Sequence, residues 1–344
     1  MSDNLKKESA ISHNRIRLSK LLPYGLVVLI VVGCLIIWQM YDMPTGILPT
    51  NLLRLMPDVE FQFAIGGEGT TGNNKLSEPL AVDISDDNGD IFVADTLNNV
   101  IKAFDKTGQF KFSFGNKNLT YLPSDIAVSG QKVFVVDSKH SRIQVFALNG
   151  TFEKSFAGPE IGKKIGAWIP SAIFAADNGD IYATDIFYQR VIVFDKTGQV
   201  KNCFGVPGSG NDQLLYPNGI TVDSTGQIYV SDSNNNRIQV FDRQGKFLDV
   251  LKNGDQPLSF SMPRGIALSR DNLLYVTETF GHNLRILKLG ANGIKSTAVV
   301  GERGVGADEM NFPNDLSIKR SSLCIADRAN NRILVYRVLD IYPF

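Results

Sequence analysis

The sequence is poor in several residue types that carry recognisable chemistry. Its 344 residues include three cysteines and three histidines, and no two cysteines form a C-x-x-C pair. This excludes a disulfide-stapled scaffold, a cysteine-rich zinc module and a C-x-x-C-H haem site. Positive charge is not in excess either, since 35 Lys and Arg balance 35 Asp and Glu, which argues against a nucleic-acid-binding protein. Hydrophobic residues make up 43% of the chain, so we expect a large core rather than disorder.

One segment near the N-terminus lacks charge altogether. Residues 21–41 read LLPYGLVVLIVVGCLIIWQMY. About 20 residues at roughly 1.5 Å each span the hydrocarbon core of a bilayer. Trp38 and Tyr41 lie at the far end, where amphipathic rings prefer the membrane interface. Five basic residues precede the segment, and only Arg54 follows closely, so we expect a cytoplasmic N-terminus and an extracytoplasmic remainder, periplasmic or at the cell surface.

Two other interpretations of this segment stay open. A cleaved signal peptide needs a small-x-small cleavage site, and the sequence WQMYDMP offers none. The sequence VVGC ending at Cys34 resembles a lipoprotein lipobox, but the residues after Cys34 are still apolar. We favour an uncleaved single-pass signal-anchor, and we leave processing at Cys34 open.

From about residue 60 onward one unit recurs six times. Each unit starts with a proline and an alternating apolar segment, and the starting prolines lie 44 to 50 residues apart. A second segment such as IYVSD ends in an acid, a third such as RIQVFD follows, and a fourth such as QFKFSFG completes most units. Their period-two alternation and their Val, Ile, Phe and Tyr content indicate strands, joined by glycine-centred hairpin turns. The starting prolines are Pro79, Pro123, Pro170, Pro217, Pro263 and Pro313.

The sixth unit has no fourth strand, because the chain stops at Phe344. The segment VEFQFAIGGEG at 59–69 has the fourth-strand pattern without a unit before it. We therefore expect this N-terminal strand to complete the last blade, which would remove exposed sheet edges. The predicted fold is all-β, a six-bladed β-propeller with four-stranded antiparallel blades, preceded by one transmembrane helix. Its predicted parts are a cytoplasmic tail 1–20, a signal-anchor helix 21–41, a linker 42–58, the propeller 59–338 and a C-terminal tail 339–344.

The repeat resembles the NHL repeat, most closely in PNGITVDSTGQIYVSDSNNNRIQVFDRQGKFLDV at 217–250. The Gly-His and Trp-Asp marks of WD40 repeats and a diglycine in every blade, as in kelch repeats, are missing. The resemblance covers residues 59–338 and implies a six-bladed propeller. Some NHL propellers bind RNA through a basic face. We expect no nucleic acid here, because the propeller is mildly acidic and extracytoplasmic in the predicted topology.

An acid ends the second strand of every unit, and in four units an arginine follows five positions later. Such an acid and arginine flank one short loop, so we expect them to pair and to hold that loop. Recurrence in every blade fits architecture, because a catalytic site would occur once. Val100 and Asn283 replace the arginine in the other two units. The acids are Asp95, Asp137, Asp185, Asp232, Glu278 and Asp327, and the arginines are Arg142, Arg190, Arg237 and Arg332.

Evidence for catalysis is sparse. A six-bladed amidating lyase in the NHL family uses zinc on three histidines, and only two histidines lie outside the N-terminal segment here. No G-x-S-x-G motif is present, and Cys203 and Cys324 are expected to be buried free thiols. We expect no catalytic residue and no cofactor. The alternative is a calcium- or zinc-dependent hydrolase or lyase at the channel mouth, where the candidate metal ligands are Asp125, Asn218, Asn314 and Asp315, with Ser124 and Arg264 beside them.

Binding is the function that the sequence favours. The loops between second and third strands are small and polar in most units, but DIFYQR at 185–190 and ETFGHN at 278–283 carry aromatic residues. Aromatic residues gathered on one face are typical of a surface for a protein, peptide or glycan. The alternative is that each ring packs over its neighbouring blade. We expect a non-catalytic scaffold or sensor whose binding-face candidates are Trp168, Phe187, Tyr188, Phe280, His140 and His282.

Overall fold

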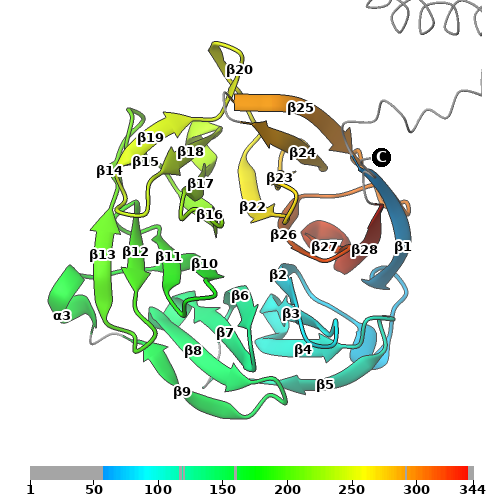
Figure 1. Ribbon diagram of the computed structural model, residues 1–344. Helices are drawn as coiled ribbons and strands as arrows, with labels where there is room; N and C mark the ends of the chain where they lie inside the picture. The colour runs from blue at the N-terminus through cyan, green and yellow to red at the C-terminus, as the bar shows by residue number, and fades with distance from the viewer. Residues whose placement is uncertain (1–56, 116–117, 119–120, 159–160, 291–292, 340–344) are drawn as a thin grey trace, which may run out of the picture. The chain divides into compact units, whose positions relative to one another are not determined.

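Six four-stranded antiparallel sheets surround a central axis in this computed structural model (Figure 1). The structure describes residues 57–115, 118, 121–158, 161–290 and 293–339. The alternating segments form strands because successive side chains on a strand point to opposite faces of its sheet. The prediction of an all-β, six-bladed propeller with four-stranded blades is confirmed.

Every blade begins with its innermost strand, and that strand starts at one of the six prolines. Proline is tolerated at the first residue of a strand, where it removes no essential ladder hydrogen bond. The chain then runs outward through the blade. In blades 1 to 3 the strands are β2 (Pro79–Ile84), β3 (Ile91–Asp95), β4 (Val100–Phe104) and β5 (Phe110–Phe114); β6 (Pro123–Ser129), β7 (Lys132–Asp137), β8 (Arg142–Ala147) and β9 (Phe152–Ala157); β10 (Pro170–Ala175), β11 (Ile181–Asp185), β12 (Arg190–Phe194) and β13 (Val200–Phe204).

The N-terminal strand completes blade 6, as predicted. β1 (Asp58–Gly66) pairs antiparallel with β28 (Arg332–Leu339), so that Asp58 lies opposite Leu339 and Gly66 opposite Arg332. This pairing closes the ring of blades and leaves β28 without an open edge. The remaining strands of blades 4 to 6 are β16 (Pro217–Val222), β17 (Ile228–Asp232), β18 (Arg237–Phe241) and β19 (Phe247–Val250); β22 (Pro263–Leu268), β23 (Leu273–Glu278), β24 (Asn283–Gly290) and β25 (Gly293–Val300); β26 (Pro313–Lys319) and β27 (Ser322–Asp327).

The core is divided among the junctions between blades. Each of six clusters of buried hydrophobic residues combines side chains from two neighbouring blades. At the junction of blades 6 and 1, for example, Ile65 and Cys324 pack with Val82 and Phe104. The closing strand therefore contributes to the core, because Ile65 belongs to β1.

The two faces of the propeller differ in what they carry. The face at which the inner strands begin, here called the upper face, bears the blade connections and the loops between second and third strands. The opposite, lower face bears the hairpins after the inner strands. Short elements decorate the connections: α3 (Gly162–Ile165), the pair β14 (Val206–Pro207) and β15 (Gln213–Leu214), and the pair β20 (Lys252–Asn253) and β21 (Gln256–Pro257).

The membrane anchor is a prediction about another part of the chain. Within the described residues, no helix has the length and the apolar character needed to cross a membrane. The predicted tail 1–20, the anchor 21–41 and nearly all of the linker 42–58 lie outside those residues. The anchor therefore stays a prediction.

Candidate functional site

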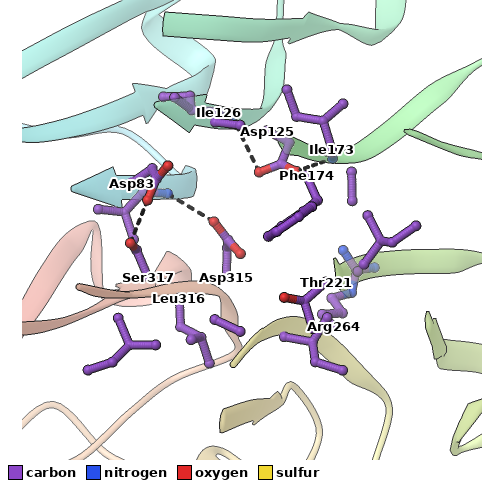
Figure 2. A pocket seen from close by; sticks show the side chains of 18 of the residues that line it. Asp83, Asp125, Ile126, Ile173, Phe174, Thr221, Arg264, Asp315, Leu316 and Ser317 are labelled. Atoms are coloured by element: carbon purple, nitrogen blue, oxygen red, sulfur yellow. Dashed lines mark hydrogen bonds between the residues drawn. The ribbon is translucent and has the colours of Figure 1, made fainter. Parts of the chain in front are cut away.

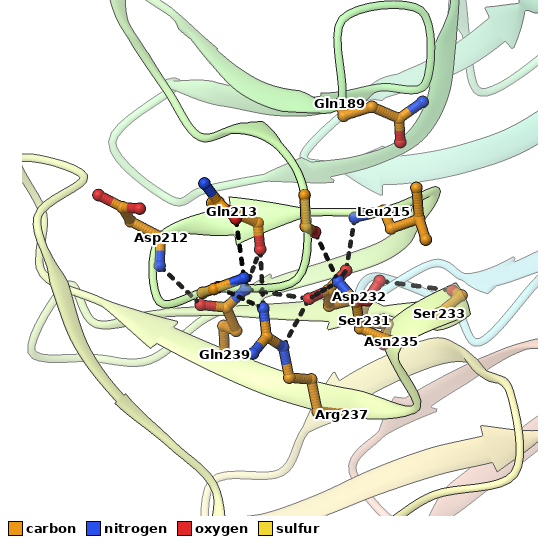
Figure 3. Close-up of polar contacts among 12 residues, drawn as sticks. Gln189, Asp212, Gln213, Leu215, Ser231, Asp232, Ser233, Asn235, Arg237 and Gln239 are labelled. Atoms are coloured by element: carbon orange, nitrogen blue, oxygen red, sulfur yellow. Dashed lines mark hydrogen bonds and ion pairs between the residues drawn. The ribbon is translucent and has the colours of Figure 1, made fainter.

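The acid at the end of each second strand is fully or almost fully buried and holds its own blade together. In blade 4 the Asp232 carboxylate accepts the backbone N–H of Leu215 (2.7 Å), the Nε of Arg237 (2.7 Å) and the Nε2 of Gln239 (3.0 Å), as Figure 3 shows. The Nη2 of Arg237 in turn donates to the Gln213 carbonyl (2.9 Å). The acid thus ties the start of the inner strand to the third strand. The predicted pairs are present, with Nε–Oδ2 distances of 2.9 Å for Arg142–Asp137 and Arg190–Asp185, and 2.7 Å for Arg332–Asp327.

The two blades without the expected arginine use another cation. The Nζ of Lys102 lies 2.9 Å from Asp95, and the Nη2 of Arg285 lies 2.9 Å from Glu278. Both cations stand seven positions after the acid, two residues beyond the usual place. Alternate strand residues share a face, so a long side chain there still reaches the carboxylate.

A second repeated contact links each blade to the next across the upper face. The last residue of the loop between second and third strands has a left-handed backbone, with φ between 51 and 57°. In five of the six loops its side chain accepts a hydrogen bond from the residue before the next blade's starting proline. The acceptors and donors are Asn99 and Leu122 (2.9 Å), Gln189 and Tyr216, Asn236 and Met262 (2.9 Å), His282 and Phe312 (3.2 Å), and Asn331 and Glu78 (2.8 Å).

The two candidate histidines hold their loops. The His282 Nδ1 accepts the Phe312 N–H, which requires a neutral ring with its proton on Nε2. Burial and the nearby charge of Arg303 lower the pKa of His282 below its ordinary value, in agreement with that role. The His140 Nδ1 lies 2.8 Å from the Asp137 carboxylate, and Tyr121 packs edge-on against its ring.

Three of the candidate aromatic residues are exposed on upper-face loops. The exposed fractions are 49% for Phe187, 43% for Tyr188 and 61% for Phe280. Phe187 and Tyr188 contact each other at 4.8 Å between ring centroids, and the Arg190 guanidinium lies over the Tyr188 ring. Phe280 contacts Phe312 at 6.0 Å. The two groups belong to blades 3 and 5 and do not form one cluster.

Trp168 does not join these exposed rings. Its side chain is only 2% exposed and lies in the core cluster between blades 2 and 3, 5.8 Å from the Phe194 ring. The expectation of an exposed indole is therefore wrong, because the connection after blade 2 folds inward over the junction. Cys203 also departs from expectation, since it is exposed, whereas Cys324 is buried.

Other exposed apolar residues of the upper face escaped the sequence analysis. Leu97 lies in the blade 1 loop, and Leu122 and Tyr216 directly precede starting prolines. The signal that could have found Leu122 and Tyr216 is their position, because the residue before each starting proline lies on the upper face. Tyr216 and Leu122 also line the channel that the inner strands enclose.

This central channel is a cavity of about 1090 Å³ lined by residues from all six inner strands. Asp83, Asp125 and Asp315 come from blades 1, 2 and 6, and Phe174 and Arg264 from blades 3 and 5 (Figure 2). The wall thus combines carboxylates with an aromatic ring and a guanidinium, and further charged residues line it as well, among them Asp177, Asp271 and Lys319.

The channel carboxylates connect neighbouring blades through backbone hydrogen bonds. Asp83 accepts the N–H of Val128, Asp125 that of Ile173 (both 2.6 Å), and Asp315 that of Val82 (3.0 Å). Burial raises the pKa of Asp125 well above its usual range, with the charge of Asp315 as a second cause. Burial also raises the pKa of Asp315, to about 7.

The candidate metal ligands are engaged with protein groups. Asn218 accepts from the Ser171 hydroxyl (3.0 Å), and Asn314 accepts from the Arg264 Nη1 (2.8 Å) and donates to the Leu80 carbonyl (2.7 Å). The carboxylates of Asp125 and Asp315 accept the backbone bonds given above. In the part of the chain that the structure describes, no group of three or more His, Cys, Asp or Glu is placed to hold a metal ion.

Comparison with known proteins identifies the repeat. The NHL repeat model matches residues 120–146 and 214–241. The Drosophila melanogaster protein brain tumor is 30% identical over 147 residues, which are 40% of this chain and 13% of that protein. The chain thus matches only a small part of that relative.

Solved structures share the fold at low sequence identity. Virginiamycin B lyase from Staphylococcus aureus has a TM-score of 0.57 at 15% identity, covering 82% of this chain and all of that one. A Bacteroides thetaiotaomicron protein of unknown function has a TM-score of 0.62 at 15% identity, covering 82% of this chain and 76% of that one. PQQ-bound aldose sugar dehydrogenase from Streptomyces coelicolor has a TM-score of 0.58 at 12% identity, covering 82% and 98%. These likenesses establish the fold alone, and together with the repeat match they show that the chain carries NHL repeats and is a six-bladed β-propeller.

Proposed function

We propose that this protein is a membrane-anchored, extracytoplasmic NHL-repeat propeller that binds a protein or peptide partner on its upper face. NHL propellers generally bind proteins. The observation that carries the proposal is the exposure of Phe187, Tyr188 and Phe280 on upper-face loops. At the corresponding places blades 4 and 6 have small or polar residues, so the rings are not part of the repeated architecture. Large exposed aromatic side chains are the residues that contribute most binding energy at protein interfaces.

The closing strand enters the propeller at the face opposite the exposed rings. Asp58 pairs with Leu339 at the lower end of blade 6, so the segment before β1 joins the propeller on its lower side. The uncharged residues 21–41 and the basic residues before them support an anchor with a cytoplasmic N-terminus.

Crosslinking in the native membrane tests the binding surface. We expect the full chain to crosslink to a partner that the combined variant Phe187→Ala, Tyr188→Ala and Phe280→Ala no longer captures. The matched control is Leu248→Ala with Val299→Ala, two apolar residues of similar exposure on outer strands. Equal capture by both variants would contradict the proposed surface.

Labelling of Cys203 tests on which side of the membrane the propeller lies. This thiol is exposed, Cys324 is buried and Cys34 lies in the predicted membrane segment. A membrane-impermeant maleimide at mildly alkaline pH should label the protein in intact cells, and Cys203→Ser should abolish the labelling. Labelling only after permeabilisation would place the propeller in the cytoplasm.

A further inference from the structure

The residue after each starting proline forms a ring near the upper end of the channel. In five blades this residue is uncharged, and only in blade 5 is it charged, as Arg264. A feature that recurs in every blade serves the architecture, whereas this cation occurs once. The uncharged members of the ring are Leu80, Ser124, Ser171, Asn218 and Asn314.

Arg264 also lacks the partner that other arginines of the propeller have. Its Nη1 donates to the neutral Asn314 Oδ1 at 2.8 Å, and its Nε is buried without a hydrogen-bond partner. No carboxylate among the described residues forms an ion pair with it, in contrast to Arg237 and Arg332, which bond to buried acids. Protein atoms cover Nε, so the donor of this guanidinium that is left for a ligand is Nη2, which forms no hydrogen bond with the described residues.

The surrounding charges leave the guanidinium uncompensated. Arg328 places a second positive charge near it, and Arg328 is itself paired with Glu78 at 3.2 Å. Burial and this second cation lower the pKa of Arg264 below its usual value. The channel acids of blades 1, 2 and 6 are held by backbone N–H groups of neighbouring blades. A partly buried cation without a counter-charge is costly, and binding an anion reduces that cost.

We propose that the upper end of the channel is a binding site for a small organic carboxylate, held by Arg264. A guanidinium N–H forms a strong, charge-assisted hydrogen bond with a carboxylate oxygen, and the unbonded Nη2 of Arg264 is the donor available for it. A single cation balances a single negative charge, which favours a carboxylate over a dianionic phosphate beside the channel acids. Phe174 and the aliphatic residues of the inner strands provide an apolar wall, and the cavity of about 1090 Å³ accommodates a small molecule (Figure 2). The site is independent of the proposed partner surface.

Titration calorimetry of the purified full chain with benzoate, an aromatic carboxylate, tests this site. We expect the wild-type protein to bind benzoate at millimolar concentration, and Arg264→Gln to bind at least about tenfold more weakly. Arg264→Lys keeps the charge but loses the planar guanidinium that holds Nη2 in place, so its affinity should be intermediate. The matched control is Arg270→Gln, which removes an exposed arginine at the lower end of the same channel and should bind like the wild type.

Thermal unfolding of each variant verifies that the propeller is folded. Unchanged benzoate binding by Arg264→Gln, loss of binding in Arg270→Gln, or no binding by the folded wild-type protein would each overturn the site. Inorganic phosphate titrated in parallel distinguishes the anion. Tighter, Arg264-dependent binding of phosphate than of benzoate would overturn the assignment of a carboxylate ligand.

Discussion

Lys102 neutralises the buried carboxylate of Asp95 at 2.9 Å from a position two residues beyond the place where four other blades have an arginine. Asp95 is fully buried, and its carboxylate also accepts the backbone N–H of Ser77 (2.7 Å) and the Nδ2 of Asn98 (2.9 Å). In the antiparallel pair of β3 and β4, Asp95 lies opposite Val100, and Lys102 is the diagonal neighbour on the same face. The blade therefore keeps the ion pair while changing both the residue and its position.

Replacing Lys102 should destabilise the propeller, and a second substitution at Val100 should restore the lost stability. Lys102→Met leaves a buried acid without a cation, which costs about 3–5 kcal/mol in the free energy of unfolding. Adding Val100→Arg restores the arrangement of the other blades and should recover most of that loss. Chemical denaturation measures both changes, with the exposed Lys106→Met as a control expected within about 0.5 kcal/mol of the wild type. Failure of Val100→Arg to rescue would show that the position of the cation matters beyond its charge.

His282 should make stability fall in mild acid. Its pKa is lowered in the folded state, so folding opposes protonation and stability decreases as the pH falls below about 6.5, the ordinary value for histidine. His282→Asn installs the residue that blades 1, 4 and 6 use at this position and removes the titrating group. The free energy of unfolding, measured across this range, should decline less in His282→Asn than in the wild-type protein. Parallel curves would contradict the role of the neutral ring.

Asp315 should make the stability of the propeller fall as the pH rises, opposite to the effect of His282. Its pKa is raised to about 7 in the folded state, while an unfolded aspartate titrates near its ordinary value of about 4. The folded protein therefore binds a proton that the unfolded chain has lost, and stability falls as the pH rises through this window. Asp315→Asn keeps an acceptor for the Val82 N–H and lacks the charge. Its stability relative to the wild type should increase between about pH 4 and pH 8, by on the order of 1–3 kcal/mol, in denaturation curves. A constant difference would contradict this titration.

Truncating Trp168 should reduce the stability of the propeller much more than truncating Phe280. Trp168→Ala empties a site at the junction of blades 2 and 3 and should cost about 3–5 kcal/mol. Phe280→Ala removes a ring that is 61% exposed and should cost less than about 1 kcal/mol. Thermal and denaturant unfolding distinguish the two. Similar losses for both variants would mean that Phe280 packs as part of the core.

The sequence predicted the propeller well because a repeat supplies the same evidence six times. The prolines, the alternating segments and the acids at their ends recur at nearly constant spacing, and even the missing fourth strand has its counterpart in β1. The connections between blades, and the residues that depart from the repeat, lack this regular spacing. Trp168 lies in a connection, where no alternation separates buried from exposed rings, and Lys102 and Arg285 act from a register position that a fixed five-residue spacing misses. The bonds from side chains such as Asn236 to the next blade connect segments whose proximity only the closed ring creates.

The pairing of β1 with β28 also has a consequence for biosynthesis. The first strand of the propeller to leave the ribosome pairs with a strand of the sixth blade, so it stays unpaired until the other five blades and β28 have been made. During that time Phe61, Phe63 and Ile65 are apolar side chains without their final neighbours, and blade 6 cannot assemble. A premature stop before β28 would therefore remove one strand of blade 6 and leave β1 without its partner.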